Sequence, residues 1–410
     1  MPRPSQDRSH PGSRREREAA VRLLTICLAR ETEFDPDAAL DLVRRSSPAV
    51  VLEMARYHRV GGSAYQRLRS LPVPESLAGG LREMYSEAVH RHLRTVWALS
   101  RLQPVLDASE VPWTVIKGPV LAELVYGDPG MRTYNDLDLL VEPRRFRDVV
   151  ELLELTGAKL LDRNWKVIRR EVFGELHLLL DAGVMLDLHW SLVTIYRGRT
   201  AMSSTEVLAR RQRVALAGVP AWSLEPVDQL LHLAVHAALS GADKLVWIKD
   251  IDLAVGRSGL NWDAVAERAE RWRIGAPVGL MLSRVADTLG TPVPDGLPDR
   301  LLGRYYAGLV RLVDRASPWQ HALGRVTTPS LLLSRSIGQG PLGGARWFVR
   351  RSIRSLDPRE PVASFAFTPR GDSSDRDAFF EAVASAQPPP SDADGSDGEA
   401  SGHRDEAARR

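Results

Sequence analysis

The hydrophobic pattern of this 410-residue chain changes its period near Val111, and that change limits the possible folds more than any other feature. From about Glu16 to Ala108, apolar residues recur every three or four positions, which predicts helices. After Val111 the pattern is different: VPWTVIKG, DLDLLV, VIRREVFGELHLLL and VMLDLHWSLV are β-rich runs. Asp181-Ala182-Gly183 separates the last two of these runs and is a hairpin signal. The chain is therefore predicted to have an α+β fold.

Composition divides the chain further. Helical periodicity returns at Pro226, in DQLLHLAVHAAL, DKLVWIKDIDLAVG and WDAVAERAERW. Both ends are polar, and the Pro, Ser, Gly and acidic content of the C-terminal end predicts disorder. Pro104 is expected to kink or end the helix that precedes the first strand. We expect five parts: a disordered segment at 1–15, a helical N-terminal region at 16–108, an α+β core at 109–224, a helical C-terminal domain at 225–367 and a disordered acidic tail at 368–410.

Charge and cysteine content exclude several protein classes. Cys27 is the single cysteine, which rules out a disulfide scaffold and a multi-cysteine metal cluster. The sequence has no run of 18 apolar residues and no apolar segment near its start, so we expect neither a transmembrane helix nor a signal peptide, and a cytoplasmic location. The net charge of +3 includes a tail with five arginines and ten acidic residues, which leaves residues 1–367 at +8. That positive body favours an anionic ligand.

Asp136 and Asp138 flank Leu137 in a run that predicts a strand. Residues two apart on a strand project from the same face, so both carboxylates point one way. Two like charges in this arrangement favour a divalent cation between them, and hard cations such as Mg²⁺ take oxygen ligands. The D-x-D pattern alone is weak evidence, because it occurs five times in the chain.

One of the other D-x-D pairs looks almost the same but has a different context. KDIDLAV is close to NDLDLLV, yet the apolar residues around it, such as Leu245, Ile248 and Ile251, have helical spacing. We therefore expect Asp250 and Asp252 to be exposed charges on a helix, with Asp250 capable only of a supporting role.

Three features set the first pair apart. Upstream, Lys117-Gly118 ends a β-rich run, where lysine supplies a cation for phosphate and glycine permits close approach of the backbone. Arg132, in the loop before the aspartates, offers a guanidinium fork that matches phosphate. Downstream, Asp187 in MLDLHW is a candidate third carboxylate. Three carboxylates that hold two divalent ions are a recurring device for phosphoryl and nucleotidyl transfer.

Histidines give weaker signals. His189 lies two residues after Asp187 and is a supporting candidate that would orient a carboxylate or contact substrate. His232 and His236 have i, i+4 spacing, but the glutamate that a zincin motif needs after the first histidine is replaced by Leu233. We therefore do not expect a zinc site there.

Taken together, an apolar strand that ends in Lys-Gly, a loop arginine, D-[IL]-D-L-L-V and a later strand with L-H-W resemble the uncharacterised nucleotidyltransferase family of the polymerase-β superfamily. The resemblance continues through LEPVDQLLHLAVHAA, KLVWIKDIDLAV and NWDAVAERAERW, and covers roughly residues 85–295. It implies a minimal nucleotidyltransferase core over 109–224, with a mixed sheet of four or five strands and flanking helices. The C-terminal helical domain would close over the nucleotide.

The same resemblance implies an activity and assigns the site. An NMP would pass from an NTP to an acceptor hydroxyl or phosphate, with release of pyrophosphate. Two Mg²⁺ ions, or Mn²⁺ in their place, would be the cofactors. The catalytic and metal-binding residues would be Asp136, Asp138 and Asp187, and the nucleotide-binding residues Lys117, Gly118 and Arg132. The acceptor stays open between a small molecule, a peptide, a sugar phosphate and RNA, and the oligomeric state is equally open.

Two other functions remain alternatives. A sugar-nucleotide-dependent glycosyltransferase also binds a divalent ion through D-x-D, although that fold usually begins with a nucleotide-binding βαβ run. A catalytically inactive nucleotide-binding or interaction protein is the second alternative. Its best support is Pro119, which follows Gly118 where the superfamily usually has a small residue that helps to hold phosphate, and which offers neither a hydroxyl nor an N–H.

Overall fold

The structure is a computed structural model, and it describes residues 12–171, 174–193, 201–257, 259–321, 329, 333–334 and 369–385. The expected disorder at residues 1–11 and 386–410, and most of the helical region expected beyond residue 321, lie outside these ranges.

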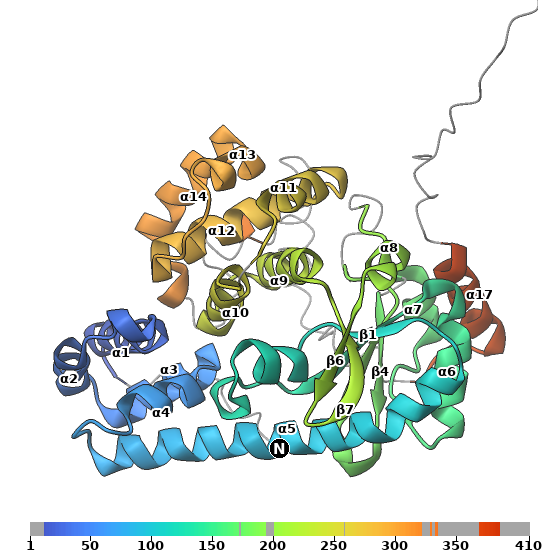
Figure 1. Ribbon diagram of the computed structural model, residues 1–410, viewed down its shortest axis with the longest axis horizontal. Helices are drawn as coiled ribbons and strands as arrows, with labels where there is room; N and C mark the ends of the chain where they lie inside the picture. Colours follow the sequence, from blue (N-terminus) through green and yellow to red (C-terminus); the bar gives the residue numbers. More distant parts are fainter. Residues whose placement is uncertain are drawn as a thin grey trace, which may run out of the picture.

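Five helices precede the sheet, and the last of them runs along one side of the whole molecule (Figure 1). They are α1 (Arg14–Leu28), α2 (Pro36–Arg44), α3 (Pro48–His58), α4 (Gly61–Leu68) and α5 (Glu75–Ala108). Of the two outcomes predicted at Pro104, a kink or an end, the end is wrong, because α5 continues through this residue. Pro104 lies on the exposed face, where water can bond to the carbonyl that loses its N–H donor. Neither α5 nor any other described helix is long and apolar enough to cross a membrane.

A mixed sheet of seven strands forms the centre of the fold, where four or five strands were predicted. Its order is β3-β4-β5-β2-β1-β7-β6. The strands are β1 (Trp113–Val115), β2 (Asp136–Val141), β3 (Lys159–Leu160), β4 (Glu175–Leu179), β5 (Met185–His189), β6 (Gln212–Leu216) and β7 (Val219–Ser223). Strands β4 and β5 form the predicted hairpin, whereas the first part of VIRREVFGELHLLL is helical, as α7 (Trp165–Glu171).

The β6–β7 hairpin accounts for the two strands at one edge that the sequence did not reveal. Ala217 and Gly218 make its two-residue turn, both with positive φ. Pro220 makes the segment look unlike a strand, because proline donates no ladder hydrogen bond. The structure accommodates it because β7 pairs with β1 only at Ser223, beyond the proline.

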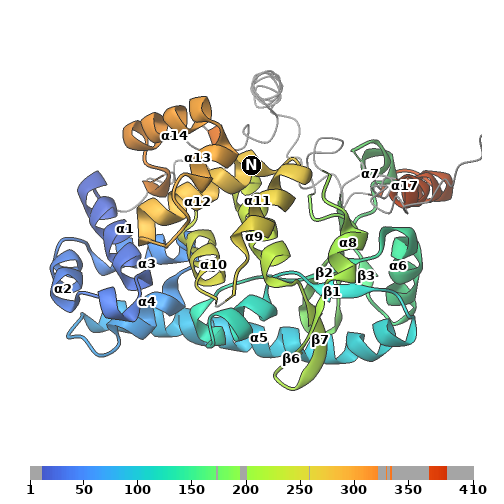
Figure 2. The same cartoon turned by 45° about the horizontal axis from the view of Figure 1, so that its top comes forward.

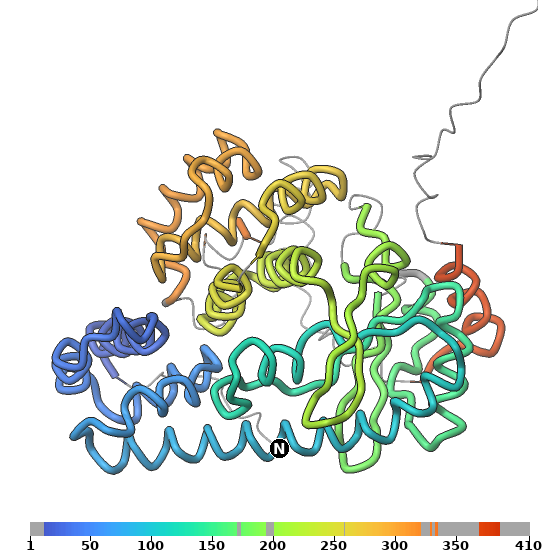
Figure 3. The backbone as a smooth tube through the Cα atoms, in the orientation of Figure 1, coloured from blue at the N-terminus to red at the C-terminus, as the bar shows by residue number. Residues whose placement is uncertain are grey.

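Helices from both ends of the chain make one helical lobe beside the sheet. The C-terminal helices are α9 (Pro226–Ser240), α10 (Leu245–Val255), α11 (Trp262–Arg271), α12 (Gly275–Leu289), α13 (Leu297–Leu302) and α14 (Arg304–Ala316). Their buried apolar side chains form one hydrophobic core with those of α1–α4. The second core lies around the sheet and includes α6 (Phe146–Leu155) and the C-terminal half of α5. Figures 2 and 3 show this lobe alongside the sheet, with α5 passing beneath both and α8 (Ser204–Ala209) near the strand ends.

Residues 373–385 were predicted to belong to a disordered tail, but they form α17 (Ser373–Ser385) on the outer side of the sheet (Figure 1). Phe379, Phe380 and Val383 are buried in the core around the sheet. The Phe379 and Phe380 rings both lie about 6 Å, centroid to centroid, from that of Trp165. The overall composition of the acidic tail concealed these three apolar residues. Their i, i+1, i+4 spacing is enough to form one apolar face of a helix.

We expect Phe379→Ala to lower the free energy of unfolding by about 3–5 kcal/mol, because it leaves a cavity in a closed core. Chemical denaturation followed by circular dichroism measures this loss. Glu381→Ala on the exposed face of α17 is the matched control and should change stability by less than about 0.5 kcal/mol. Equal losses in the two variants would show that α17 does not pack as the structure describes.

Candidate functional site

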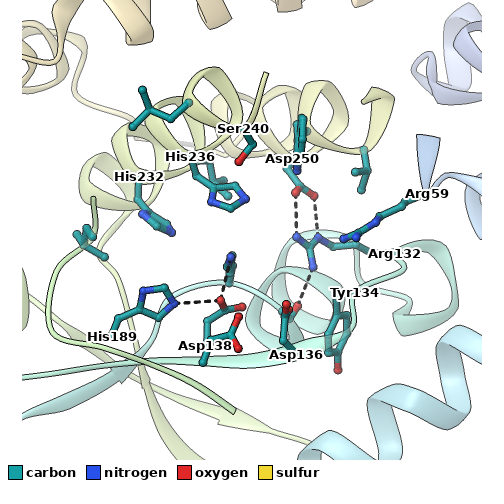
Figure 4. Close-up of a pocket in the computed structure, with 18 of the residues that line it drawn as sticks. Arg59, Arg132, Tyr134, Asp136, Asp138, His189, His232, His236, Ser240 and Asp250 are labelled. Atoms are coloured by element: carbon teal, nitrogen blue, oxygen red, sulfur yellow. Dashed lines mark hydrogen bonds and ion pairs between the residues drawn. The ribbon is translucent and has the colours of Figure 1, made fainter. Parts of the chain in front are cut away.

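The three candidate catalytic aspartates lie on two neighbouring parallel strands. Asp136 and Asp138 begin β2, and in the β2–β5 register Asp138 lies directly opposite Asp187 of β5, while Asp136 lies opposite Met185. Side chains two apart on a strand share a face, and so do directly paired residues on adjacent strands. All three carboxylates consequently line one cavity of about 390 Å³, which lies between the sheet and the helical lobe (Figure 4).

Asp138 is fully buried and has two cationic neighbours. The Lys117 Nζ atom is 2.8 Å from Oδ1 of Asp138, and Nε2 of His189 is 3.2 Å from the same oxygen. Burial opposes ionisation of this carboxyl, but Lys117 and His189 outweigh it and hold its pKa below the usual range. Lys117, predicted as a phosphate ligand, thus lies in the cavity as the counter-ion of Asp138. The other oxygen, Oδ2, has no hydrogen-bond partner among the described residues.

Glu175 on β4 extends this group and was missed by the sequence analysis. It pairs with His189 in the β4–β5 register, and its Oε2 lies 3.1 Å from Nδ1 of His189. Burial lowers the pKa of His189, but Glu175 and Asp138 outweigh it and raise the pKa above its usual value. His189 therefore lies between two carboxylates: its Nε2 is hydrogen-bonded to Asp138, whereas its Nδ1 faces Glu175 at ion-pair distance without a hydrogen bond. A signal for Glu175 was present, because the predicted hairpin turn at 181–183 places it opposite His189.

The pKa of Asp187 is shifted in the opposite direction to that of Asp138. Burial and the nearby charges of Asp138 and Asp136 raise the pKa of its carboxyl to about 7. Its Oδ1 has no hydrogen-bond partner among the described residues, and the nearest cation, Nε2 of His177, is 3.9 Å away. A buried carboxylate with an unsatisfied oxygen gains from a cation, and Asp138 presents a second such oxygen.

These observations test the fit to a divalent ion. Ligand atoms of Asp138, Asp187 and His189 lie within 4.8 Å of one another. Mg²⁺ prefers oxygen ligands, and these come from Asp138 and Asp187, with Asp136 on the same face. The donor set fits a hard divalent cation.

The Lys117-Gly118 turn brings the backbone close to β2. Gly118 has φ of +61°, and a Cβ there would lie 3.2 Å from the carbonyl oxygen of Asp136. Both the left-handed backbone and the tight approach favour glycine. The turn therefore brings the buried backbone of Gly118 to the cavity wall beside the first aspartate.

Arg132 and Asp250 form a buried ion pair that links the sheet to the helical lobe. The Arg132 Nε and Nη2 atoms donate to the two carboxylate oxygens of Asp250 at 2.8 and 2.9 Å, and the Tyr126 hydroxyl donates to Oδ1 at 2.9 Å. Asp250 lies on α10 as predicted, but the expectation of an exposed charge is wrong, because only 1% of it is accessible. Asp252 is also buried and pairs with Lys249. The tertiary contact with Arg132, invisible in the helical spacing, buries Asp250.

The opposite wall of the cavity comes from α9 and α10. His232 and His236 lie on the face of α9 that lines it, as the i, i+4 spacing allows (Figure 4). Burial, and then the charges of Lys117 and His189, lower the pKa of His232 to about 3, and burial lowers that of His236 strongly. Neither ring nitrogen of His232 has a hydrogen-bond partner among the described residues. Both imidazoles are neutral at physiological pH.

This neutrality predicts a loss of stability in mild acid. The pKa of His232 is lower in the folded protein than its unfolded value of about 6.5, so between these values only the unfolded chain takes up the proton. Stability is therefore full above pH 6.5 and is lost as pH falls, by about 2 kcal/mol at pH 5 from this residue.

Denaturation of His232→Gln at pH 7 and pH 5 measures this contribution, and the loss on acidification should be about 2 kcal/mol smaller than in wild type. His90→Gln, at an exposed position on α5, is the matched control and should retain the wild-type loss. If His232→Gln lost as much stability as wild type between pH 7 and pH 5, this result would contradict the neutral, buried state of the His232 ring.

The chain was compared with solved structures and with curated proteins. Solved structures similar to this chain include two that each share 15% sequence identity with it. One is the solution structure of the antibiotic-resistance factor ANT(2'')-Ia, with a TM-score of 0.31 over 48% of this chain and 95% of that one. The other is an antigenic nucleotidyltransferase-like protein from Paracoccidioides brasiliensis, with a TM-score of 0.26 over 51% of this chain and 94% of that one. No curated protein matches the sequence.

The family match is more extensive than either structural likeness. Residues 46–290 match the family model described as "Uncharacterised nucleotidyltransferase". The matched span contains β1–β7, helices α9–α11 and every residue of the cavity described above. Because this span exceeds half of the sequence, the chain belongs to the family of uncharacterised nucleotidyltransferases.

Proposed function

We propose that the protein is a Mg²⁺-dependent nucleotidyltransferase that transfers an NMP from an NTP to an acceptor hydroxyl or phosphate and releases pyrophosphate. One structural observation supports this proposal in addition to family membership. Asp138 and Asp187 meet from adjacent strands inside a cavity, each with a buried carboxylate oxygen that has no hydrogen-bond partner among the described residues. Such a pair is costly without a cation and suited to one.

The metal ligands in this proposal are Asp136, Asp138 and Asp187. When bound, Mg²⁺, or Mn²⁺ in its place, would supply positive charge for the phosphates of the substrate and for the leaving pyrophosphate. The chain's own contribution is to hold Asp138 ionised, which Lys117 and His189 do by direct contact. Glu175, whose Oε2 lies 3.1 Å from Nδ1 of His189, in turn raises the pKa of that imidazole.

Asp187 has the protonation behaviour of a general base. The pKa of about 7 belongs to the site without a cation, and a bound Mg²⁺ would lower it, which leaves the carboxylate ionised and able to accept a proton at physiological pH. We assign it the proton of the acceptor hydroxyl. The Lys117-Gly118 turn would lie along the phosphates, since it lines the cavity and its glycine allows close approach of the backbone beside Asp136.

The variant Asp187→Asn tests the proposal. It removes a ligand oxygen and the base, so Mn²⁺ affinity should fall by at least about tenfold and pyrophosphate release should be lost. The raised pKa shows that ionising Asp187 costs the folded protein free energy at neutral pH, so the neutral amide should leave the unfolding midpoint unchanged or raise it. Calorimetric Mn²⁺ titration, pyrophosphate release from each NTP with panels of acceptors, and thermal unfolding measure the three effects.

Asp181→Asn is the matched control, because Asp181 is an exposed residue in the turn of the same hairpin. It should keep wild-type Mn²⁺ affinity and turnover. Undiminished Mn²⁺ affinity and pyrophosphate release in Asp187→Asn would overturn the site assignment. Release of a nucleoside diphosphate from a sugar nucleotide, without pyrophosphate release from NTPs, would favour the glycosyltransferase alternative.

A further inference from the structure

The cationic side chains that line the cavity differ in what they contact. Lys117 pairs with Asp138, and Arg132 is bound through two nitrogens to Asp250. Both charges are therefore compensated within the protein. A polyanionic ligand gains less from a cation that already has a buried partner, because binding must compete with that partner.

Among the described residues, Arg59 is the cavity-lining cation without such a partner. It follows α3 and points toward the cavity near Arg132 and Tyr134 (Figure 4). Its guanidinium makes no hydrogen bond or ion pair with any residue in the described part of the chain. Burial, the largest effect, lowers its pKa from the usual value, while Asp136 and Asp250 act in the opposite direction. A half-buried guanidinium with unused donors has lost part of its hydration without a replacement.

The backbone at Arg59 is also unusual. Its φ and ψ of 56° and 37° are left-handed, and its N–H closes the last turn of α3. Glycine or asparagine is common at such a helix end because a larger L-residue there is strained. An arginine held in this conformation therefore has a cost to the fold, and strain of this kind concentrates at ligand sites.

Contacts next to Arg59 fix the α3–α4 junction relative to the loop that precedes β2. A Cβ at Gly62 would come within 1.8 Å of the carbonyl oxygen of Gly130, so the two backbones touch. The Ser63 hydroxyl donates to the carbonyl oxygen of Met131 at 2.8 Å, one residue before Arg132. The start of α4 is thus joined to the loop that leads into β2. Arg59, three residues earlier, is held at a defined position over the cavity.

We propose that Arg59 is a phosphate-binding residue that contacts the triphosphate of the incoming nucleotide. The inference rests on the proposed function and adds a phosphate ligand from the N-terminal helices of the helical lobe. An arginine presents a planar fork of donors that matches phosphate oxygens. Arg59 lines the same cavity as Asp136, one of the proposed metal ligands, and so lies where a metal-bound triphosphate would be within reach (Figure 4).

Inorganic triphosphate with Mg²⁺ is the probe, because it carries the proposed group without any base. In calorimetric titrations, Arg59→Asn should bind it about tenfold more weakly than wild type, which corresponds to the loss of a charge-assisted contact. Asparagine tolerates left-handed backbone, so this variant should fold with an unfolding midpoint no lower than that of wild type. Arg59→Lys keeps the charge without the fork and should bind with intermediate affinity.

Arg56→Asn is the matched control, since Arg56 is an exposed arginine in the last turn of the same helix. It should bind the probe as wild type does. Wild-type affinity in Arg59→Asn would overturn this inference and leave the proposed function standing. Failure of the wild-type protein to bind either the probe or any NTP with Mg²⁺ would overturn both. Equal weakening in Arg56→Asn and Arg59→Asn would show a general charge effect and also overturn the inference.

Discussion

The buried carboxylate of Asp138 is the constraint on which the site depends. A fully buried charge is tolerated only with partners, and here they come from three places along the chain: Lys117 after β1, His189 at the end of β5 and, behind it, Glu175 on β4. The antiparallel β4–β5 hairpin and the parallel β2–β5 pairing are both needed to bring them together. The strand order of the sheet and the electrostatics of the site are therefore linked.

The helical lobe supplies the part of the cavity wall that the sheet does not form. Its core joins helices from both ends of the chain, so side chains of α3, α9 and α10 belong to one hydrophobic core. The Arg132–Asp250 pair, buried on both sides, fixes α10 to the loop before β2. The cavity thereby has an acidic floor on the sheet, a wall of neutral histidines from α9 and a corner formed by the α3–α4 junction.

Local sequence was informative where strand periodicity alone decides the outcome. The alternation in DLDLLV places both aspartates on one face, and MLDLHW is the strand that carries Asp187. The family was also identifiable from such short motifs. Glu175 was within reach, because the hairpin turn sets the register that pairs it with His189. The helix of Asp250 was predicted correctly, but its burial was not, since helical spacing contains no information about a partner 118 residues away.

By itself the sequence determined the α+β class, the carboxylates that share a strand face and the family to which the chain belongs. Only the tertiary structure decided which cations are already paired, and so which are available to a ligand. The reason is that periodicity fixes the direction of a side chain relative to its own element, whereas charge compensation depends on residues far apart in the chain. Arg59 is one of many arginines in the sequence. It is distinguished by a left-handed backbone and by the absence of a partner for its guanidinium among the described residues.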